Sequence, residues 1–147
     1  MKKVLLYIWQ LPQHIIGLLL ILLLNAKKEW WPLKPNGEVF WFWEFVPKGR
    51  FGRFISGVSL GGYIILKPGS DYAQTVPHER GHSIQSRYWG PLYLLAVGLP
   101  SALFNNLWDR IFHRNWPVEK RLKWYYSRYP EKQADRLGGV GREYWGT

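Results

Sequence analysis

Two histidines and a glutamate in residues 75–82 are spaced for metal-dependent hydrolysis. In this stretch, Thr-Val-Pro-His-Glu-Arg-Gly-His, His78 and His82 are four positions apart and Glu79 follows the first histidine. Positions four apart lie on one face of a helix, one turn from each other, so both imidazoles can reach one ion. Glu79 is offset by about 100° and can point at a water molecule held by that ion. Zinc lowers the pKa of such a water to about 7, which would allow Glu79 to take its proton. The alternative is a pair of surface histidines on an ordinary helix.

A second pair of side chains with the same spacing follows in residues 129–135, Tyr-Pro-Glu-Lys-Gln-Ala-Asp. A catalytic zinc site takes three protein ligands and keeps one position open, so Glu131 can be the third ligand. Asp135, one helical turn later, can accept the second ring N–H of a ligating histidine and fix its tautomer. Taken alone, the pair would indicate the capped, solvated first turn of a helix.

Together, the two stretches resemble the gluzincin, or thermolysin-like, zinc metallopeptidases, which carry His-Glu-x-x-His on one helix and Glu-x-x-x-Asp on a later helix. The resemblance implies that His78, His82 and Glu131 bind Zn²⁺. It also implies that Glu79 is the general base and that Asp135 orients a histidine ligand. The wider block of residues 77–140 also looks like a small bacterial module of unassigned function. The predicted location is a membrane, the bacterial inner membrane.

The chain departs from the gluzincin pattern in two ways. The insertion between His82 and Glu131 is longer than in compact members of the family. Gluzincins usually add a later His or Tyr that stabilises the oxyanion of the transition state, and no His follows Glu131. The sequence leaves four candidates for this role: Tyr125, Tyr126, Tyr129 and Tyr144.

Composition points to a membrane surface. The 147 residues carry 20 Lys and Arg against 10 Asp and Glu, a net charge of +10, and include ten Trp. Trp and Tyr are enriched at bilayer interfaces, and basic residues favour anionic lipid headgroups. A nucleic-acid partner is not expected, because the charge is spread along the chain and no Gly-rich phosphate loop accompanies it. The absence of Cys excludes disulfides, thiolate zinc ligands and thiol catalysis.

The most apolar stretch is residues 4–24, flanked by lysines at both ends. Its length is sufficient to span about 30 Å of hydrocarbon, with a bend expected near Pro12. A cleaved signal peptide is the alternative, but residues 25–28 lack a small-x-small cleavage site, which favours retention. We therefore predict a membrane anchor helix in residues 1–28 and a zincin-like domain in residues 29–147.

Residues 29–37 are predicted to form a loop, and residues 38–46 and 63–66 are predicted strands. By resemblance, residues 57–66 supply the edge strand that binds substrate backbone; a plain core strand is the alternative. The metal helix is predicted to begin at Thr75 or Val76, with Pro77 in its first turn, and to end before Gly90. A small residue at Gly81 would let another backbone approach the site.

The apolar segment 92–104 is short for a membrane span. A single crossing would place His82 and Glu131 on opposite sides of the membrane. The segment is therefore a re-entrant stretch, one arm of a hairpin, or a buried helix. Asn105-Asn106 is the predicted turn back. Residues 118–126 form a basic, aromatic helix, either on the membrane surface or solvated, and Pro130 begins the second metal helix.

The sequence thus predicts an α+β fold with an N-terminal membrane helix, a small β-sheet and two zinc-binding helices. The predicted function is a membrane-anchored zinc hydrolase, expected to be a metallopeptidase acting on a polypeptide. The alternative is a non-catalytic zinc-binding membrane or structural protein, because a chain of 147 residues leaves little room for a substrate cleft.

Overall fold

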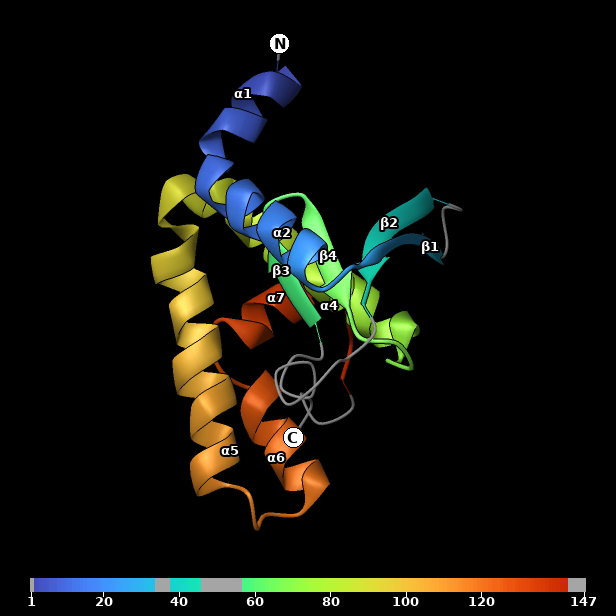
Figure 1. The fold of residues 1–147 in the computed structure, drawn as a ribbon. Coiled ribbons are helices and arrows are strands. Elements are labelled where there is room, and N and C mark those ends of the chain that lie inside the picture. The colour runs from blue at the N-terminus through green and yellow to red at the C-terminus, as the bar shows by residue number, and fades with distance from the viewer. Residues whose placement is uncertain (1, 34–37, 46–56, 143–147) are drawn as a thin grey trace.

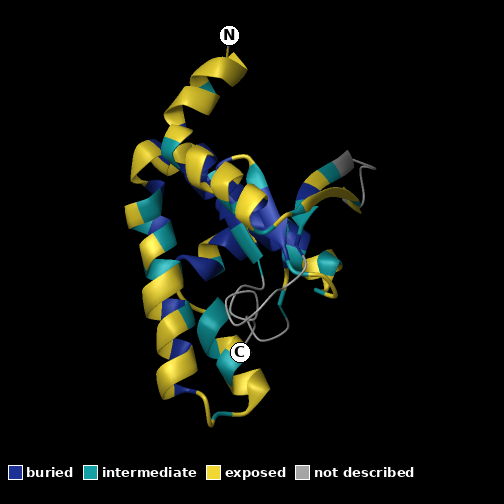
Figure 2. Ribbon diagram, viewed as in Figure 1, coloured by how far each residue is buried: buried dark blue, intermediate teal, exposed yellow. Residues whose placement is uncertain are grey.

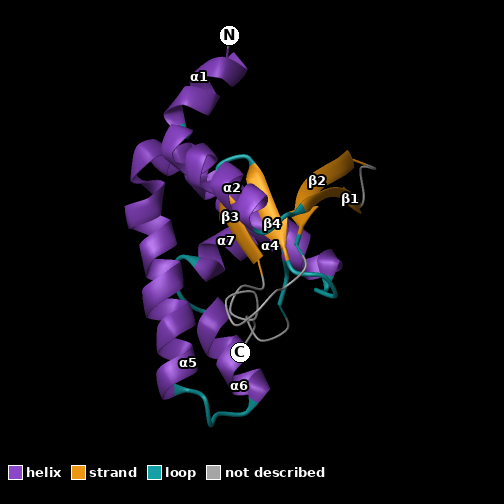
Figure 3. Ribbon diagram, in the orientation of Figure 1, coloured by secondary structure: helices purple, strands orange, loops and turns teal. Residues whose placement is uncertain are grey.

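The structure, a computed structural model, describes residues 2–33, 38–45 and 57–142 and has an α+β fold (Figure 1). Figure 3 shows helices gathered around a small sheet, as the sequence predicted. The helices and strands are α1 (Lys2–Trp9), α2 (Leu11–Leu23), β1 (Lys27–Leu33), β2 (Glu38–Glu44), β3 (Gly57–Leu60), β4 (Tyr63–Leu66), α4 (Tyr72–Trp89), α5 (Trp108–Phe112), α6 (Val118–Tyr126) and α7 (Glu131–Gly138). Three further helical stretches, η1 (Gly90–Leu92), η2 (Leu94–Gly98) and η3 (Pro100–Leu107), lie between α4 and α5.

The sheet is mixed and has the order β1-β2-β4-β3. β1 and β2 are antiparallel, β2 and β4 are parallel, and β3 and β4 form an antiparallel hairpin with Leu60 opposite Tyr63. Gly61, in the turn, has a φ of 64°, a left-handed conformation that favours glycine. Because β3 is the last strand in this order, it lies at an edge, where no strand of the described residues pairs with its outer side.

The prediction of a loop at residues 29–37 is wrong for residues 29–33, which belong to β1. Two aromatic cross-strand pairs hold this strand, Trp30 opposite Trp41 and Trp31 opposite Phe40. Pro32 is compatible with it because β1 is an edge strand, where a missing N–H is tolerated. Residues 34–37 lie outside the described part of the chain, as do residues 46–56.

The sheet lies between α2 and α4. On one face Phe42, Ile64 and Leu66 pack with Val76 of α4. On the other, Phe45 and Ile65 pack with Ile21 of α2. Both helices that carry the sequence's most distinctive segments are thus fixed by the same strands.

α4, the predicted metal helix, begins about one turn earlier than the sequence indicated, at Tyr72. Tyr72 packs its ring against those of Trp31 and Phe42, which holds this extra turn against the sheet. Pro77 consequently lies inside the helix and not in its first turn. The helix ends at Gly90, as predicted, where φ is 50°.

Residues 93–112 form a continuous helical run in which η2 and η3 are π-helical. Every fourth residue faces inward: Tyr93, Val97, Asn105, Asp109 and His113 are buried and Ser101 is half-buried. In an α-helix such a stripe would rotate about 40° per step. A π-helix has more residues per turn, so it keeps a four-residue repeat closer to one face.

The predicted turn at Asn105-Asn106 is wrong, because the helix runs through both residues. The Asn105 amide donates to the Tyr129 carbonyl oxygen at 3.1 Å, and the Asn106 amide donates to the Tyr125 hydroxyl at 3.1 Å. The chain turns instead at residues 113–117, and α6 runs back beside α5 (Figure 1). Segment 92–104 and residues 105–112 therefore belong to the same arm of a helical hairpin, whose other arm is α6.

Within the described residues, no single helix is both long and apolar enough to cross a bilayer. α1 and α2 meet those criteria only as a pair, bent by 77° at their junction.

Candidate metal centre

α4 and α7 approach each other closely because glycine occupies both contact points. A Cβ atom at Gly81 would lie 1.8 Å from the carbonyl oxygen of Ala134. A Cβ atom at Gly138 would lie 1.9 Å from the carbonyl oxygen of Pro77. The prediction that a small residue at position 81 lets another backbone approach is confirmed, and that backbone belongs to α7.

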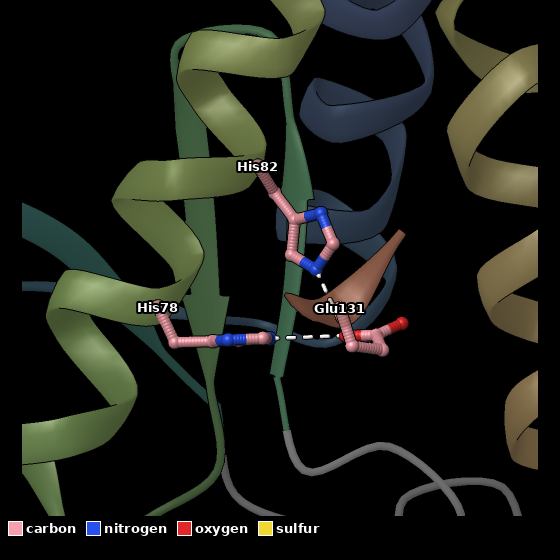
Figure 4. A group of neighbouring side chains, drawn as sticks. All are labelled: His78, His82 and Glu131. Atoms are coloured by element: carbon pink, nitrogen blue, oxygen red, sulfur yellow. Dashed lines mark hydrogen bonds and ion pairs between the residues drawn. The ribbon is translucent and has the colours of Figure 1, made fainter. Parts of the chain in front are cut away.

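This contact brings together the three predicted metal ligands (Figure 4). The Nε2 atoms of His78 and His82 each lie 3.1 Å from Oε2 of Glu131. One ligand atom from each residue lies within 4.8 Å of the others, and all three residues are buried. The three side chains form a group that could hold a metal ion.

The Nδ1 atom of each histidine faces an acceptor. Asp135 Oδ1 lies 2.7 Å from Nδ1 of His78, as the sequence predicted, and Gln85 Oε1 lies 2.7 Å from Nδ1 of His82. These acceptors favour the tautomer with the proton on Nδ1, which leaves the Nε2 lone pair directed at the site.

Gln85 also ties the two metal helices together, and sequence reasoning missed it. Its amide donates to the Pro130 carbonyl oxygen at 3.1 Å and to Gln133 Oε1 at 2.8 Å. Its position three residues after His82 places it on a neighbouring part of the same helical face. An amide at that spacing is the signal that could have identified it.

Two further side chains that the sequence did not indicate support the carboxylates. The Ser101 hydroxyl donates to Oε1 of Glu131 at 2.5 Å, which leaves Oε2 facing the histidines. Arg142 donates from Nε to Asp135 Oδ2 at 2.6 Å and from Nη2 to Asp135 Oδ1 at 3.0 Å. Its guanidinium also lies 3.4 Å from the centre of the Tyr126 ring.

Two of the three separations between the donor atoms are close to those of a tetrahedral zinc site. Ligand atoms about 2.0–2.2 Å from zinc and at the tetrahedral angle are about 3.4 Å apart. The Nε2 atoms of both histidines lie 3.1 Å from Glu131 Oε2, and all three atoms lie within 4.8 Å of one another. Three buried carboxylates, those of Glu79, Glu131 and Asp135, surround the site, and Arg142 offsets one of them. A divalent cation would offset the other two.

The neighbouring charged groups shift the pKa values of His78 and Glu131. Burial lowers the pKa of His78, but hydrogen bonds to Asp135 and Glu131 outweigh burial and raise this pKa to about 10. Burial raises the pKa of Glu131, but the charge of His82 and hydrogen bonds with both histidines hold it well below its ordinary value. The two histidines and the Glu131 carboxylate thus stabilise each other's charged forms, and a metal ion that binds here would displace the proton from the Nε2 atom of each histidine.

Glu79 is buried beside the ligands but is not one of them. Its Oε2 atom has no hydrogen-bond partner among the described residues. Burial raises its pKa, against the opposing effect of His82 and His78. A Cβ atom at Gly57 would lie 2.6 Å from Glu79 Oε1, so the edge strand β3 approaches this carboxylate closely.

A cavity of about 760 Å³ contains the site, and its lining distinguishes between the four candidate tyrosines. Tyr125 and Tyr126 line it, and the Tyr126 ring meets that of His78 edge-on, with centroids 5.3 Å apart. The Tyr129 hydroxyl donates to the Ala96 carbonyl oxygen instead, and Tyr129 is not among the lining residues. Tyr144 lies outside the described residues.

No family model, no curated protein and no solved structure matches the chain. The likeness to gluzincins therefore rests on the two motifs.

Proposed function

We propose that this chain is a membrane-anchored zinc hydrolase, and that it is a metallopeptidase with a gluzincin-like centre. One observation carries the proposal: a buried His-His-Glu group shares a cavity with a carboxylate, Glu79, whose Oε2 has no hydrogen-bond partner among the described residues. Three ligands with a separate base nearby are typical of a catalytic zinc site, whereas structural sites generally use four protein ligands.

The proposed roles follow from the positions of the side chains. His78, His82 and Glu131 would hold the zinc ion, which would supply Lewis-acid activation of water and of a carbonyl group. Glu79 would take the proton of the attacking water and deliver it to the leaving group. The hydroxyl of Tyr125 or Tyr126, on the cavity wall, would donate a hydrogen bond to the developing oxyanion.

A polypeptide substrate is supported by the edge strand. In an antiparallel pair, alternate residues direct their N–H and C=O groups away from the neighbouring strand. Ser59 is such a residue, and its outward carbonyl oxygen already accepts a bond from the Tyr93 hydroxyl at 2.9 Å. Gly57, two residues earlier, points the same way and lies beside Glu79. A peptide backbone that pairs with Gly57 would pass next to Glu79.

The membrane location is supported by the distribution of polar and apolar side chains on α2. Its inward residues include Gln13 and His14, which are buried, whereas many of its large apolar side chains are exposed. Figure 2 shows α1 and α2 exposed along most of their length. A helix in contact with lipid is expected to direct its polar side chains toward the protein interior and its apolar side chains outward. The net charge of +10 suits anionic headgroups, as in a bacterial inner membrane.

The test compares wild type with Glu79→Gln, which keeps the shape of the side chain and removes the base. We expect the variant to retain one zinc per chain and its thermal stability, while cleavage of a membrane-proximal peptide library falls about 10²–10⁴-fold. Glu119→Gln, an exposed position on α6, is the matched control and should cleave at the wild-type rate.

Two results would contradict the proposal. Undiminished cleavage by Glu79→Gln would remove Glu79 from the mechanism. A zinc-loaded wild type that cleaves none of these peptides would favour the non-catalytic zinc-binding membrane protein.

A further inference from the structure

The helical run of residues 93–112 has polar groups inside and apolar groups outside. Its inward stripe carries Ser101, Asn105 and Asp109, which bond to Glu131, Tyr129 and Arg121 respectively. Eight of its exposed residues are large and apolar, and Arg110, near its C-terminal end, is exposed as well; the eight are Leu95, Leu99, Leu103, Phe104, Leu107, Trp108, Ile111 and Phe112. The run is exposed along much of its outer side in Figure 2. This distribution matches that of α2, so two separate helices present lipid-compatible surfaces.

The cavity at the metal centre extends to these same helices. Leu20 of α2 lines it, together with Gly98, Ala102 and Leu107 of the 93–112 run. Five of the lining residues are exposed and therefore border its mouth: Ala102, Leu107, Arg110, Val118 and Leu122. The mouth thus lies along the helical hairpin of residues 93–126, bordered by four apolar side chains and Arg110, while His78, Glu79 and the β3 edge line the inner part.

Small residues keep this mouth open. Gly98 and Ala102 lie four positions apart on the wall, and a Cβ atom at Gly98 would meet nothing closer than 3.8 Å. Ser101, the neighbour of Ala102, donates to Glu131. One turn of helix therefore both borders the mouth and positions a metal ligand.

We propose that the substrate is an apolar, membrane-embedded segment of a polypeptide, which reaches the metal centre from the lipid side along the helical hairpin of residues 93–126. This inference rests on the proposed hydrolase function and names its substrate class. The apolar mouth would admit such a segment without exposing it to water. A polypeptide fits better than a lipid acyl chain because Gly57 of the β3 edge lies beside Glu79, and a peptide backbone can pair with its N–H and C=O groups whereas a hydrocarbon chain cannot.

The test measures binding of zinc-chelating probes, so that it does not depend on turnover. Zinc-loaded full-length protein in lipid nanodiscs is titrated with n-alkyl hydroxamates from acetohydroxamate to octanohydroxamate. Ala102→Trp fills the mouth, and Leu103→Trp, the exposed neighbour that does not line the cavity, is the matched control. Neither residue is one of the proposed ligands, and zinc content confirms that both variants fold.

We expect Ala102→Trp to bind acetohydroxamate like wild type but octanohydroxamate at least tenfold more weakly. Leu103→Trp should match wild type for both probes. Equal binding of octanohydroxamate by wild type and Ala102→Trp would overturn entry from the lipid side. A zinc-loaded wild type that binds no hydroxamate would overturn it as well.

A second probe distinguishes a peptide substrate from a lipid acyl chain. Leucyl-leucyl hydroxamate should bind wild type more tightly than octanohydroxamate, because its backbone can pair with β3. Equal or weaker binding would overturn the polypeptide assignment in favour of a lipid. These outcomes are independent of the proposed catalysis, whose failure would appear only as undiminished cleavage by Glu79→Gln or as no cleavage by wild type.

Discussion

Replacing Gly81 with alanine tests whether the contact between α4 and α7 sets the geometry of the metal centre. The new Cβ atom would lie 1.8 Å from the Ala134 carbonyl oxygen, and contacts under 3.0 Å require a shift. The two backbones must therefore separate by about 1.2 Å, since neither partner is a flexible side chain. Glu131 lies about one turn before Ala134 on α7 and would move with it. Metal–ligand distances tolerate only about 0.2 Å, so the metal-bound state must restore the close approach.

The penalty for such overpacking is about 1–3 kcal/mol. If it falls on the metal-bound state, zinc binding weakens about 5- to 150-fold. The assay is competition with a chromophoric zinc chelator, together with the thermal midpoint with and without EDTA. Gly98→Ala is the matched control, because it is also a helical glycine but its Cβ would meet nothing closer than 3.8 Å. Wild-type zinc affinity in Gly81→Ala would refute the reasoning that this contact positions Glu131.

Three other substitutions or treatments test the remaining assignments. Gln85→Leu removes the acceptor for His82 Nδ1 and should weaken zinc binding about 10- to 100-fold. Gln85→Glu keeps an acceptor oxygen and should lose less affinity. Equal zinc affinity in wild type and both variants would contradict this role of Gln85. Glu131→Ala should lose most of the single zinc equivalent measured by elemental analysis in wild type, and retention of a full equivalent would show that the third ligand is misassigned. Alkaline carbonate washing should leave the protein in the membrane pellet, and its release into the supernatant would demote residues 4–24 to a peripheral helix.

The candidate metal ligands could be predicted because the pattern that indicates them is a spacing within a single helix. Positions four apart share a helical face whatever the rest of the fold does, so His78 with His82, and Glu131 with Asp135, were readable from spacing. The sheet was partly readable for the same reason, since β4 coincides with an apolar run that begins after two glycines. The close approach at Gly81 could also be predicted, because a glycine in a helix leaves room for another backbone beside it.

The parts that could not be predicted depend on contacts between distant segments. Ser101 and Arg142 bond to carboxylates of the candidate metal centre only because the hairpin and residues 139–142 fold back onto α7. Asn105-Asn106 has the composition of a turn, but in the structure both amides bond to partners more than a dozen residues away. Those tertiary bonds outweigh the local preference, and the helix continues.

The junction of α1 and α2 explains why the apolar helices and the metal centre form one unit. The Gln10 amide donates to the Ser86 hydroxyl at 2.7 Å, and the Trp9 indole donates to the Arg87 carbonyl oxygen at 3.0 Å. The Gln13 amide donates to the Gly90 carbonyl oxygen. All three bonds reach the C-terminal end of α4, directly after Gln85.

The polar residues that interrupt the apolar segment 4–24 therefore have a structural purpose. They bind the helix that carries two of the three candidate ligands, whereas an all-apolar segment would have no such attachment. At the other side of the site, Ser101 of the lipid-compatible run holds the third candidate ligand, Glu131. If the two apolar helices lie in the bilayer as proposed, hydrogen bonds from both fix the depth of the metal centre relative to the membrane. Depth in turn decides which bond of an embedded substrate lies beside Glu79.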